Sequence, residues 1–255
     1  MDFRTRRQLV VLAILAAFFI VVGGTVVYRL LPAPTCFDNR QNQGEAGMDC
    51  GGPCIPCALA EAKPIEVFWV RFVKTREGTY DVAAELKNPN AALGAKTFDY
   101  EFKLHDTAGV VVAVRRGRSF LYPGELAHLI EVGLVSGRVL ERASLAISNP
   151  EWVVSEAGPP DLIAGGKEHS VESTDGTLFS LVRASLSNRA SADIPEVRLG
   201  VLLFDSDGNL VGASATVLER IRAGEVRPVA FRWPVSFGDR VASITVEPRI
   251  PLVPQ

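Results

Sequence analysis

The sequence predicts an all-β protein in which two tandem antiparallel β-sandwich domains follow a single transmembrane helix and a cysteine-rich stalk. Three observations lead to this prediction. Two stretches about a hundred residues apart carry the same landmarks, an uncharged apolar run lies near the N-terminus, and all four cysteines lie between residues 36 and 57. Most of the remainder consists of short segments rich in Val, Phe and Leu, separated by Gly, Pro and Asn, which is typical of β-sandwiches.

The two stretches are related by an internal duplication. Their landmarks are spaced by 99 or 100 residues: Asn88 with Asn188, Asp106 with Asp205, Gly109 with Gly208, and Gly124-Glu125 with Gly224-Glu225. A constant spacing over four landmarks indicates a repeat and not chance. We therefore place the first repeat at 64–154, a linker rich in Gly and Pro at 155–166, and the second repeat at 167–255.

Period-two alternation predicts sheets with one solvent-exposed face. The clearest case is segment 98–105, in which Phe98, Tyr100, Phe102 and Leu104 alternate with Asp99, Glu101, Lys103 and His105. Segment 79–87 alternates in the same way, and its polar side carries Asp81, Ala83 and Glu85. Both segments are therefore expected to lie with one face on a core and the other in water.

Further strands are predicted wherever apolar segments lie between turn residues. They are expected at 65–74, 110–114, 126–134 and 143–147 in the first repeat, and at 177–186, 197–205, 210–217, 226–233 and 241–246 in the second. Pro150 and Pro248 are expected to end the last strand of each repeat. Several short strands with regular turns predict an immunoglobulin-like antiparallel sandwich in each repeat.

The apolar run predicts a membrane anchor. Leu9 to Val27 is an uncharged run of 19 residues, close to the length that crosses a bilayer, and we place the transmembrane helix at 9–31. Three arginines precede it, so the positive-inside rule puts residues 1–8 in the cytoplasm and the rest of the chain outside. A cleaved signal peptide is the alternative, but the run is long and no small-residue cleavage site follows it closely.

The stalk, residues 32–63, holds all four cysteines: Cys36, Cys50, Cys54 and Cys57. In an oxidising compartment these thiols pair, and two disulfides would staple a segment that has too few apolar residues to fold alone. The sequence leaves the pairing open. A Cys54–Cys57 bridge would close a very tight ring, which favours pairing Cys57 with Cys50.

Three other chemistries are possible for the stalk. A four-cysteine zinc site would need a second close pair, and Cys36 stands alone. A redox Cys54-x-x-Cys57 motif would need a helix start, which the neighbouring prolines oppose. Calcium could bind the oxygen-bearing side chains, although such residues more often hydrogen-bond their own turns. The candidate calcium ligands are Asp38, Asn42, Glu45 and Asp49.

The stalk resembles a short cysteine-rich motif of bacterial cell-surface proteins. Its matching residues are Cys36, Asp38, Asn42, Gly44, Glu45 and the segment from Asp49 to Cys57, which contains Asp-Cys-Gly-Gly. The resemblance implies a bacterial, extracytoplasmic setting. It implies no chemistry.

Each repeat resembles the FxLYD family of small bacterial β-sandwich domains. The matching residues are Phe102, Leu104, Asp106 and Gly124 in the first repeat and Val201, Leu203, Asp205 and Gly224 in the second. His105 departs from the family's aromatic position, whereas Phe204 keeps it. The resemblance implies tethered domains outside the membrane that are not known as enzymes. Physically, the signature is a core strand that enters a turn capped by its aspartate.

No catalytic constellation is evident in the sequence. His105, His128 and His169 have no partner at metal-ligand spacing, and the net charge of -2 does not predict binding to nucleic acid. The basic cluster Arg115, Arg116 and Arg118 is expected at a solvated strand edge. The aromatic residues Phe68, Trp69 and Phe72 are expected in a sandwich core and at the junction between the domains.

The sequence therefore favours a non-catalytic, cofactor-free binding or scaffold protein of the bacterial cell envelope. It would be anchored in the membrane by one helix and would contact an envelope protein partner. The alternatives are a thiol-disulfide oxidoreductase that uses Cys54 and Cys57, or the ectodomain of a sensor or secretion complex.

Overall fold

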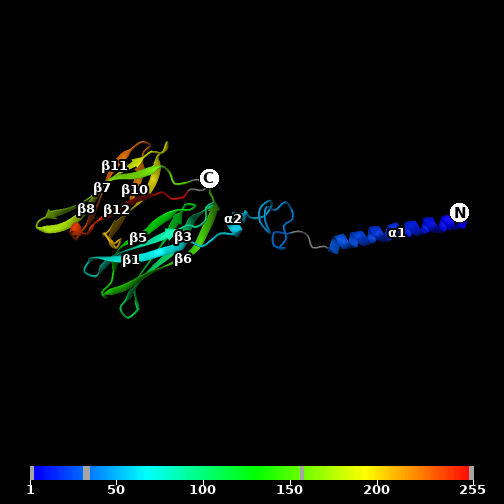
Figure 1. Ribbon diagram of the computed structural model, residues 1–255, viewed down its shortest axis with the longest axis horizontal. Helices are drawn as coiled ribbons and strands as arrows, with labels where there is room; N and C mark the ends of the chain where they lie inside the picture. The colour runs from blue at the N-terminus through cyan, green and yellow to red at the C-terminus, as the bar shows by residue number, and fades with distance from the viewer. Residues whose placement is uncertain (1–2, 31–34, 156–157, 253–255) are drawn as a thin grey trace. The chain divides into compact units, whose positions relative to one another are not determined.

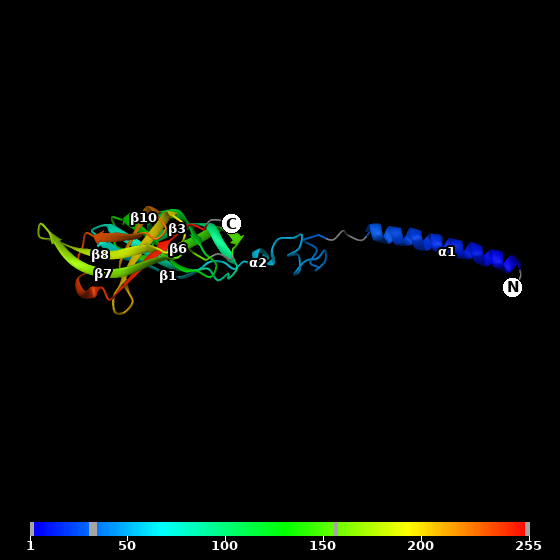
Figure 2. The same ribbon diagram turned by 90° about the horizontal axis from the view of Figure 1, so that it is seen from above.

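The structure is a computed structural model that describes residues 3–30, 35–155 and 158–252. The chain divides into two compact units, Met1–Ala60 and Glu61–Gln255. Helix α1 (Phe3–Leu30) and the short helix α2 (Cys57–Ala60) belong to the first unit (Figure 1). The twelve strands of the described residues belong to the second unit, which Figure 2 shows from above.

Helix α1 contains the apolar run. It has 28 residues, which corresponds to about 42 Å at 1.5 Å per residue. It is long and apolar enough to cross a membrane. The hydroxyl of Thr25 donates to the carbonyl oxygens of Val21 and Val22, so it is satisfied within the helix. The predicted span of 9–31 lies inside α1 except for its last residue, which is outside the described residues.

The first half of the second unit contains six strands: β1 (Glu66–Arg76), β2 (Thr79–Lys87), β3 (Leu93–Asp106), β4 (Val111–Leu121), β5 (Leu126–Val135) and β6 (Leu140–Val154). The second half contains β7 (Leu162–Thr174), β8 (Thr177–Asn188), β9 (Ile194–Phe204), β10 (Leu210–Ile221), β11 (Val226–Trp233) and β12 (Ser243–Arg249). They form four three-stranded antiparallel sheets, ordered β1-β2-β5, β4-β3-β6, β11-β8-β7 and β10-β9-β12. The two halves therefore use the same strand connectivity.

The predicted linker at 155–166 is partly wrong. Strand β7 begins at Leu162, and the sequence analysis missed this strand because Gly165-Gly166 suggested a flexible connection. In the structure this pair forms a bulge: Gly166 has a φ of 58°, and the register shifts between Gly165 and Glu168. Residues 156–157 of the predicted linker lie outside the described residues.

The two prolines expected to end the last strands do not end them. Strand β6 continues past Pro150 to Val154, and β12 continues past Pro248 to Arg249. Both strands lie at the edge of their sheets, where a proline removes no hydrogen bond of the ladder. Before Pro150, Asn149 adopts a φ of 52°, and the register shifts opposite it.

The four sheets stack as successive layers, because apolar clusters lie on both faces of the two inner ones. One cluster joins β1-β2-β5 to β4-β3-β6 and contains Val82, Phe98 and Phe102. Another joins β10-β9-β12 to β11-β8-β7 and contains Val201 and Trp233. A third joins the two halves, through Ala83 of β2 and Leu202 of β9. Strand β10 accordingly contacts β1, β2 and β5.

This stacking corrects the prediction that segment 79–87 has one wet face. Asp81, Ala83 and every residue between Tyr80 and Ala84 are buried, because sheet β1-β2-β5 is covered on both sides. Strand β9 is likewise buried through Val201, Leu202 and Leu203. Strand β3, by contrast, keeps the predicted alternation from Phe98 to Leu104 and loses it at His105, which is buried.

Charges on the outward faces decide which sheets pack together. By the repeat alignment, Leu202 in β9 corresponds to Lys103 in β3, and Ala83 in β2 corresponds to Arg183 in β8. Leu202 and Ala83 meet at the junction, whereas Lys103 and Arg183 lie in ion pairs on the outer faces. Burying an unpaired charge is costly, so these outer faces do not continue the stack.

The duplicated aspartates cap the same turn in both halves. Oδ1 of Asp106 accepts the N–H groups of Ala108 (3.0 Å) and Val110 (2.9 Å). Oδ1 of Asp205 accepts those of Asp207 (2.9 Å) and Asn209 (2.8 Å). This is the capped turn that the signature predicts. The matching turn glycines have a φ of 77° at Gly109 and 76° at Gly208, values that favour glycine.

The duplicated asparagines tie the end of one strand to the corner that precedes another. The side-chain amide of Asn88, which is fully buried, donates to the carbonyl oxygens of Leu93 and Tyr122. The amide of Asn188 donates to those of Ala192, Ile221 and Arg222. The corner glutamates also match, since Glu125 and Glu225 each accept the backbone N–H three residues earlier.

We predict that Asn88→Ala and Asn188→Ala each lower the free energy of unfolding by about 2–4 kcal/mol, because each leaves several buried backbone groups without a partner. Asn209→Ala is the control, since that exposed side chain donates only to Asp205 (3.1 Å), and it should cost less than about 1 kcal/mol. Urea unfolding of the full chain, followed by tryptophan fluorescence, measures all three. Equal effects for Asn88→Ala and the control would contradict the assignment.

Candidate functional site

The junction between the two halves combines an apolar centre with a polar margin. The centre contains Ala83, Trp69, Val73 and Ile130 from the first half and Leu202, Leu210, Ala213 and Phe204 from the second. Trp69 meets the edge of Phe204 with ring centroids 6.3 Å apart. A Cβ at Gly200 would lie 2.8 Å from Cδ1 of Ile130, so this glycine allows the two halves to approach closely. Trp69 is therefore a junction residue, as predicted, while Phe72 packs on the first core and Phe68 is exposed.

A histidine of the first half binds a carboxylate of the second. The backbone N–H of His128 donates to Oε1 of Glu247 (3.1 Å), and the ring Nδ1 lies 2.6 Å from Oε2 of the same residue. The ring Nε2 lies 3.4 Å from Oε2 of Glu85. His128 thus connects β5 to β12, and it is positioned between two carboxylates in the partly buried margin of the junction.

An arginine of the second half enters the first. Arg249, which is 9% exposed, donates to the carbonyl oxygen of Phe120 and, at 3.4 Å, to Oγ of Ser119. Its Nε lies 3.4 Å from Oε1 of Glu125 and 3.6 Å from Oε1 of Glu247. Burial raises the pKa of Glu125, and the nearby Arg249 opposes that rise.

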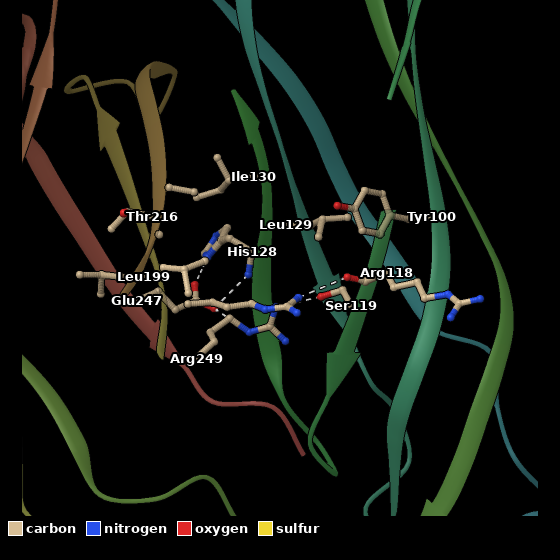
Figure 3. A pocket seen from close by; sticks show the side chains of 14 residues that line it. Tyr100, Arg118, Ser119, His128, Leu129, Ile130, Leu199, Thr216, Glu247 and Arg249 are labelled. Atoms are coloured by element: carbon tan, nitrogen blue, oxygen red, sulfur yellow. Dashed lines mark hydrogen bonds and ion pairs between the residues drawn. The ribbon is translucent and has the colours of Figure 1, made fainter. Parts of the chain in front are cut away.

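A half-open cavity of about 200 Å³ lies beside these groups and is lined by both halves (Figure 3). Leu129, Ile130, Leu199, Ala215 and Val217 form its apolar lining. Arg198 lies at the cavity, and its Nη1 donates to the carbonyl oxygen of Arg118 (3.3 Å). The side chain of Arg118 itself points away from Arg249 and Glu247 (Figure 3). The cavity is the most complete candidate binding site, because it combines an apolar wall with polar and charged groups.

Asp81 is the buried carboxylate at the other end of the junction. Its Oδ1 accepts the N–H of Gly133 (2.8 Å), and that hydrogen bond is the one described for this side chain. Burial raises its pKa to about 6, and the hydrogen bond from Gly133 opposes the rise. The residue therefore titrates close to neutral pH.

The structure pairs all four cysteines, Cys36 with Cys54 and Cys50 with Cys57. The ring-size argument favoured the second of these pairs. Cys54 and Cys57 are not bonded to each other, so the Cys-x-x-Cys segment does not form the redox disulfide of the oxidoreductase alternative. A zinc thiolate site needs free sulfurs, and none of these four is free. Glu45 lies beside the first disulfide, with Oε1 at 3.1 Å from Sγ of Cys54.

Three of the four candidate calcium ligands, Asp38, Glu45 and Asp49, use their oxygens within the stalk, whereas Oδ1 of Asn42 is buried and has no hydrogen-bond partner among the described residues. Asp49 accepts the N–H groups of Asp38 (3.0 Å) and Asn39 (2.9 Å). Asp38 accepts the N–H of Arg40 and the amide of Asn42, and Glu45 accepts the N–H groups of Asn42 and Asp49. The contacts of Asp38, Glu45 and Asp49 are those of turn residues that cap their own backbone, and calcium binding by the four residues stays a prediction.

Of the other predicted residues, Arg118 lines the junction cavity, and the rest lie outside it. His105 is buried and not on a wet face, since its ring lies 3.0 Å from Oγ of Ser144 and 3.4 Å from the carbonyl oxygen of Gly109. His169 lies 3.0 Å from Oγ of Ser180, and burial lowers its pKa. The arginines of β4 lie along an exposed sheet edge in ion pairs: Arg115 with Glu131, Arg116 with Glu101, and Arg118 with Asp99.

No sequence motif marks Glu247, Arg249 or Arg198 as site residues. Each lies on the outward face of its strand, and only the stacking of the two halves brings them to the first half. One signal was available: segment 199–204 is apolar at consecutive positions, which indicates a strand covered on both faces.

No protein-family model matches the chain. No curated protein matches it at a significant level.

We predict that Asp81→Asn stabilises the protein above pH 6. The pKa of Asp81 is about 6 in the folded chain and 3.8 ordinarily, so its protonated form is favoured by folding. The native state therefore loses stability as the pH rises from about 4 to about 6, by up to about 3 kcal/mol. Asparagine stays neutral and can still accept the hydrogen bond from Gly133.

Urea unfolding at pH 4, 5, 6 and 7.5 should show wild type and Asp81→Asn equal at pH 4, with the variant more stable from pH 6 upward. Asp207→Asn, on an exposed turn, is the matched control and should show no such divergence. A constant difference between wild type and Asp81→Asn at every pH would contradict the burial argument.

Proposed function

We propose that the protein is a single-pass membrane protein of the bacterial cell envelope that acts by binding or scaffolding and not by catalysis. Helix α1 would be the anchor, with the N-terminal arginines in the cytoplasm and the stalk and the β unit outside. The length of α1, the arginines in its first two turns and the two disulfides support this arrangement.

The two halves of the β unit would be tandem copies of one sandwich domain similar to the FxLYD family. The shared strand connectivity, the paired aspartate turns and the paired asparagine corners support a duplication. The second copy would have acquired an apolar outward face on β9, on which the first copy packs. Stacked copies of this kind provide a recognition site that neither copy has alone.

The observation that carries the proposal is the cavity at the junction, to which both halves contribute. Because the junction is rigid, the residues that line the cavity would lose little conformational entropy when a partner binds. The partner would be a protein of the same envelope, and the cavity would receive one of its side chains or its chain end.

The proposed membrane anchoring predicts that α1 is not cleaved and is embedded in the bilayer. Leu12→Arg combined with Leu15→Arg should release the protein from the membrane, because each arginine at a helix centre costs about 2.5–3.5 kcal/mol. The matched Leu12→Ala, Leu15→Ala variant should stay embedded. Carbonate extraction and intact-mass measurement of the wild type test this. A soluble wild type that lacks residues 1–30 would identify α1 as a cleaved signal sequence.

The proposed binding role predicts that filling the cavity abolishes binding of the partner. Ala215→Trp fills the apolar wall from the exposed face of β10, and Ala230→Trp makes the same change on an exposed position of β11. Cross-linking in the native membrane should capture an adduct with wild type and Ala230→Trp that Ala215→Trp lacks. Identical adducts for all three proteins, or no adduct with any, would reject the junction as the binding site.

A further inference from the structure

Two guanidinium groups of the second half meet one aromatic ring of the first at the cavity. The guanidinium carbon of Arg249 lies 4.5 Å from the centroid of Phe120, and that of Arg198 lies 5.7 Å from the same centroid. Cation–π contacts of this kind fix a guanidinium in position without neutralising its charge. The ring thus holds two positive charges near one another at the edge of the cavity.

The carboxylates nearest to these two guanidinium groups lie farther from them than in a well-formed ion pair. Arg249 Nε lies 3.4 Å from Glu125 and 3.6 Å from Glu247, and Arg198 Nε lies 3.5 Å from Glu196. Elsewhere in the chain, well-formed arginine pairs such as Arg220–Asp193 and Arg138–Asp106 have distances of 2.7 Å. Charge-assisted hydrogen bonds have lengths of about 2.7–2.9 Å, so the guanidiniums at the cavity lack a close carboxylate.

The charges of the cavity also favour an anion. Among the described residues that line it, Arg198 and Arg249 stand against one glutamate, Glu247, which His128 binds at 2.6 Å, while the side chain of Arg118 points away and pairs with Asp99. Arg198 is the accessible member of the pair, with 46% of its side chain exposed, whereas 9% of Arg249 is exposed. A ligand would therefore meet Arg198 first.

The rest of the wall is apolar and small. Ile130, Ala215 and Val217 line a volume of about 200 Å³, while Leu129 and Leu199 border it from the two cores. That space admits a short aliphatic body. An apolar body next to paired guanidiniums defines an amphipathic acid.

We propose that the junction cavity binds a carboxylate carried on a short apolar body, with Arg198 as the group that recognises the carboxylate. The inference rests on the proposed function, since it names the ligand chemistry of the same site. The carboxylate has two sources, either the acidic side chain or chain end of a protein segment, or a free aliphatic acid. In both cases the ligand's carboxylate would lie closer to the guanidinium groups of Arg198 and Arg249 than the protein's own carboxylates do.

Hexanoate is the probe, with hexan-1-ol and hexylamine as matched controls of equal chain length. The full chain in lipid nanodiscs, with ¹³C-labelled isoleucine methyls, should show saturable shifts of the Ile130 methyl on addition of hexanoate. Hexan-1-ol should bind at least about ten-fold more weakly, because it lacks the charge, and hexylamine should not bind.

Arg198→Gln should weaken hexanoate binding at least about ten-fold and leave hexan-1-ol binding unchanged. Arg198→Lys keeps the charge and should give an intermediate affinity. Arg189→Gln, on an exposed turn, is the control and should match wild type. If Arg198→Gln loses binding of hexan-1-ol as well as of hexanoate, the cavity has collapsed in that variant. Ala215→Leu then decides, since filling the wall should weaken both probes while the fold is kept.

Acetyl-Val-Leu-Glu-amide and its glutamine counterpart distinguish the two sources. Tighter binding of the glutamate peptide than of hexanoate supports a protein segment, and the reverse supports a free acid. The inference is overturned if hexanoate leaves the Ile130 methyl unshifted, or if Arg198→Gln binds hexanoate as wild type does. If neither hexanoate nor the glutamate peptide binds, but Ala215→Trp still abolishes the cross-linked adduct, the inferred ligand class is wrong and the proposed function stands. If both fail, the proposed function falls too.

Discussion

The packing of sheet β1-β2-β5 on sheet β10-β9-β12 is the constraint on which the rest of the structure depends. It buries Ala83 and Leu202 between the halves, and it puts Glu247 and Arg249 among residues of the first half. Without it, β2 and β9 would each expose an apolar face, and the cavity would have one wall. Burial of that apolar surface is the main favourable term, while the ionic contacts at its margin fix the alignment.

The junction is heterologous, because the first half uses one kind of sheet and the second half uses the other. A heterologous contact can repeat from one copy to the next and form an open array, unless the free faces differ from the faces that pack together. Here the free face of β3 carries Lys103 and Glu101 in an ion pair, and the free face of β8 carries Arg183 bound to Glu172. The two halves therefore differ at a few outward positions, which favours a stack of two and not an array.

Much of the fold could be predicted from the sequence because its signals are local. Asp106, Asp205 and the turn glycines determine turns by contacts within a few residues, and the alternation in β3 follows from one apolar neighbour on one face. Strand β7 was missed because Gly165-Gly166 looks the same in a bulge as in a linker. The junction needed information of another kind. The rings and charges of Trp69, His128 and Arg249 meet partners more than a hundred residues away, and no local pattern specifies that pairing. The residues of the candidate site were missed for the same reason.

The central claim is that the two halves form one unit through the junction, and the three tryptophans of the chain offer a direct test. Trp152 packs on the first core, Trp233 lies in the second, and Trp69 lies between the halves. Variants that retain only Trp152 or only Trp233 would report the unfolding of each half separately in urea. The account predicts that the two transitions coincide in the otherwise native chain and separate when Leu202→Asp breaks the junction. Two separate transitions without that substitution would contradict it, because the halves would then be independent domains and the cavity between them would have no fixed walls.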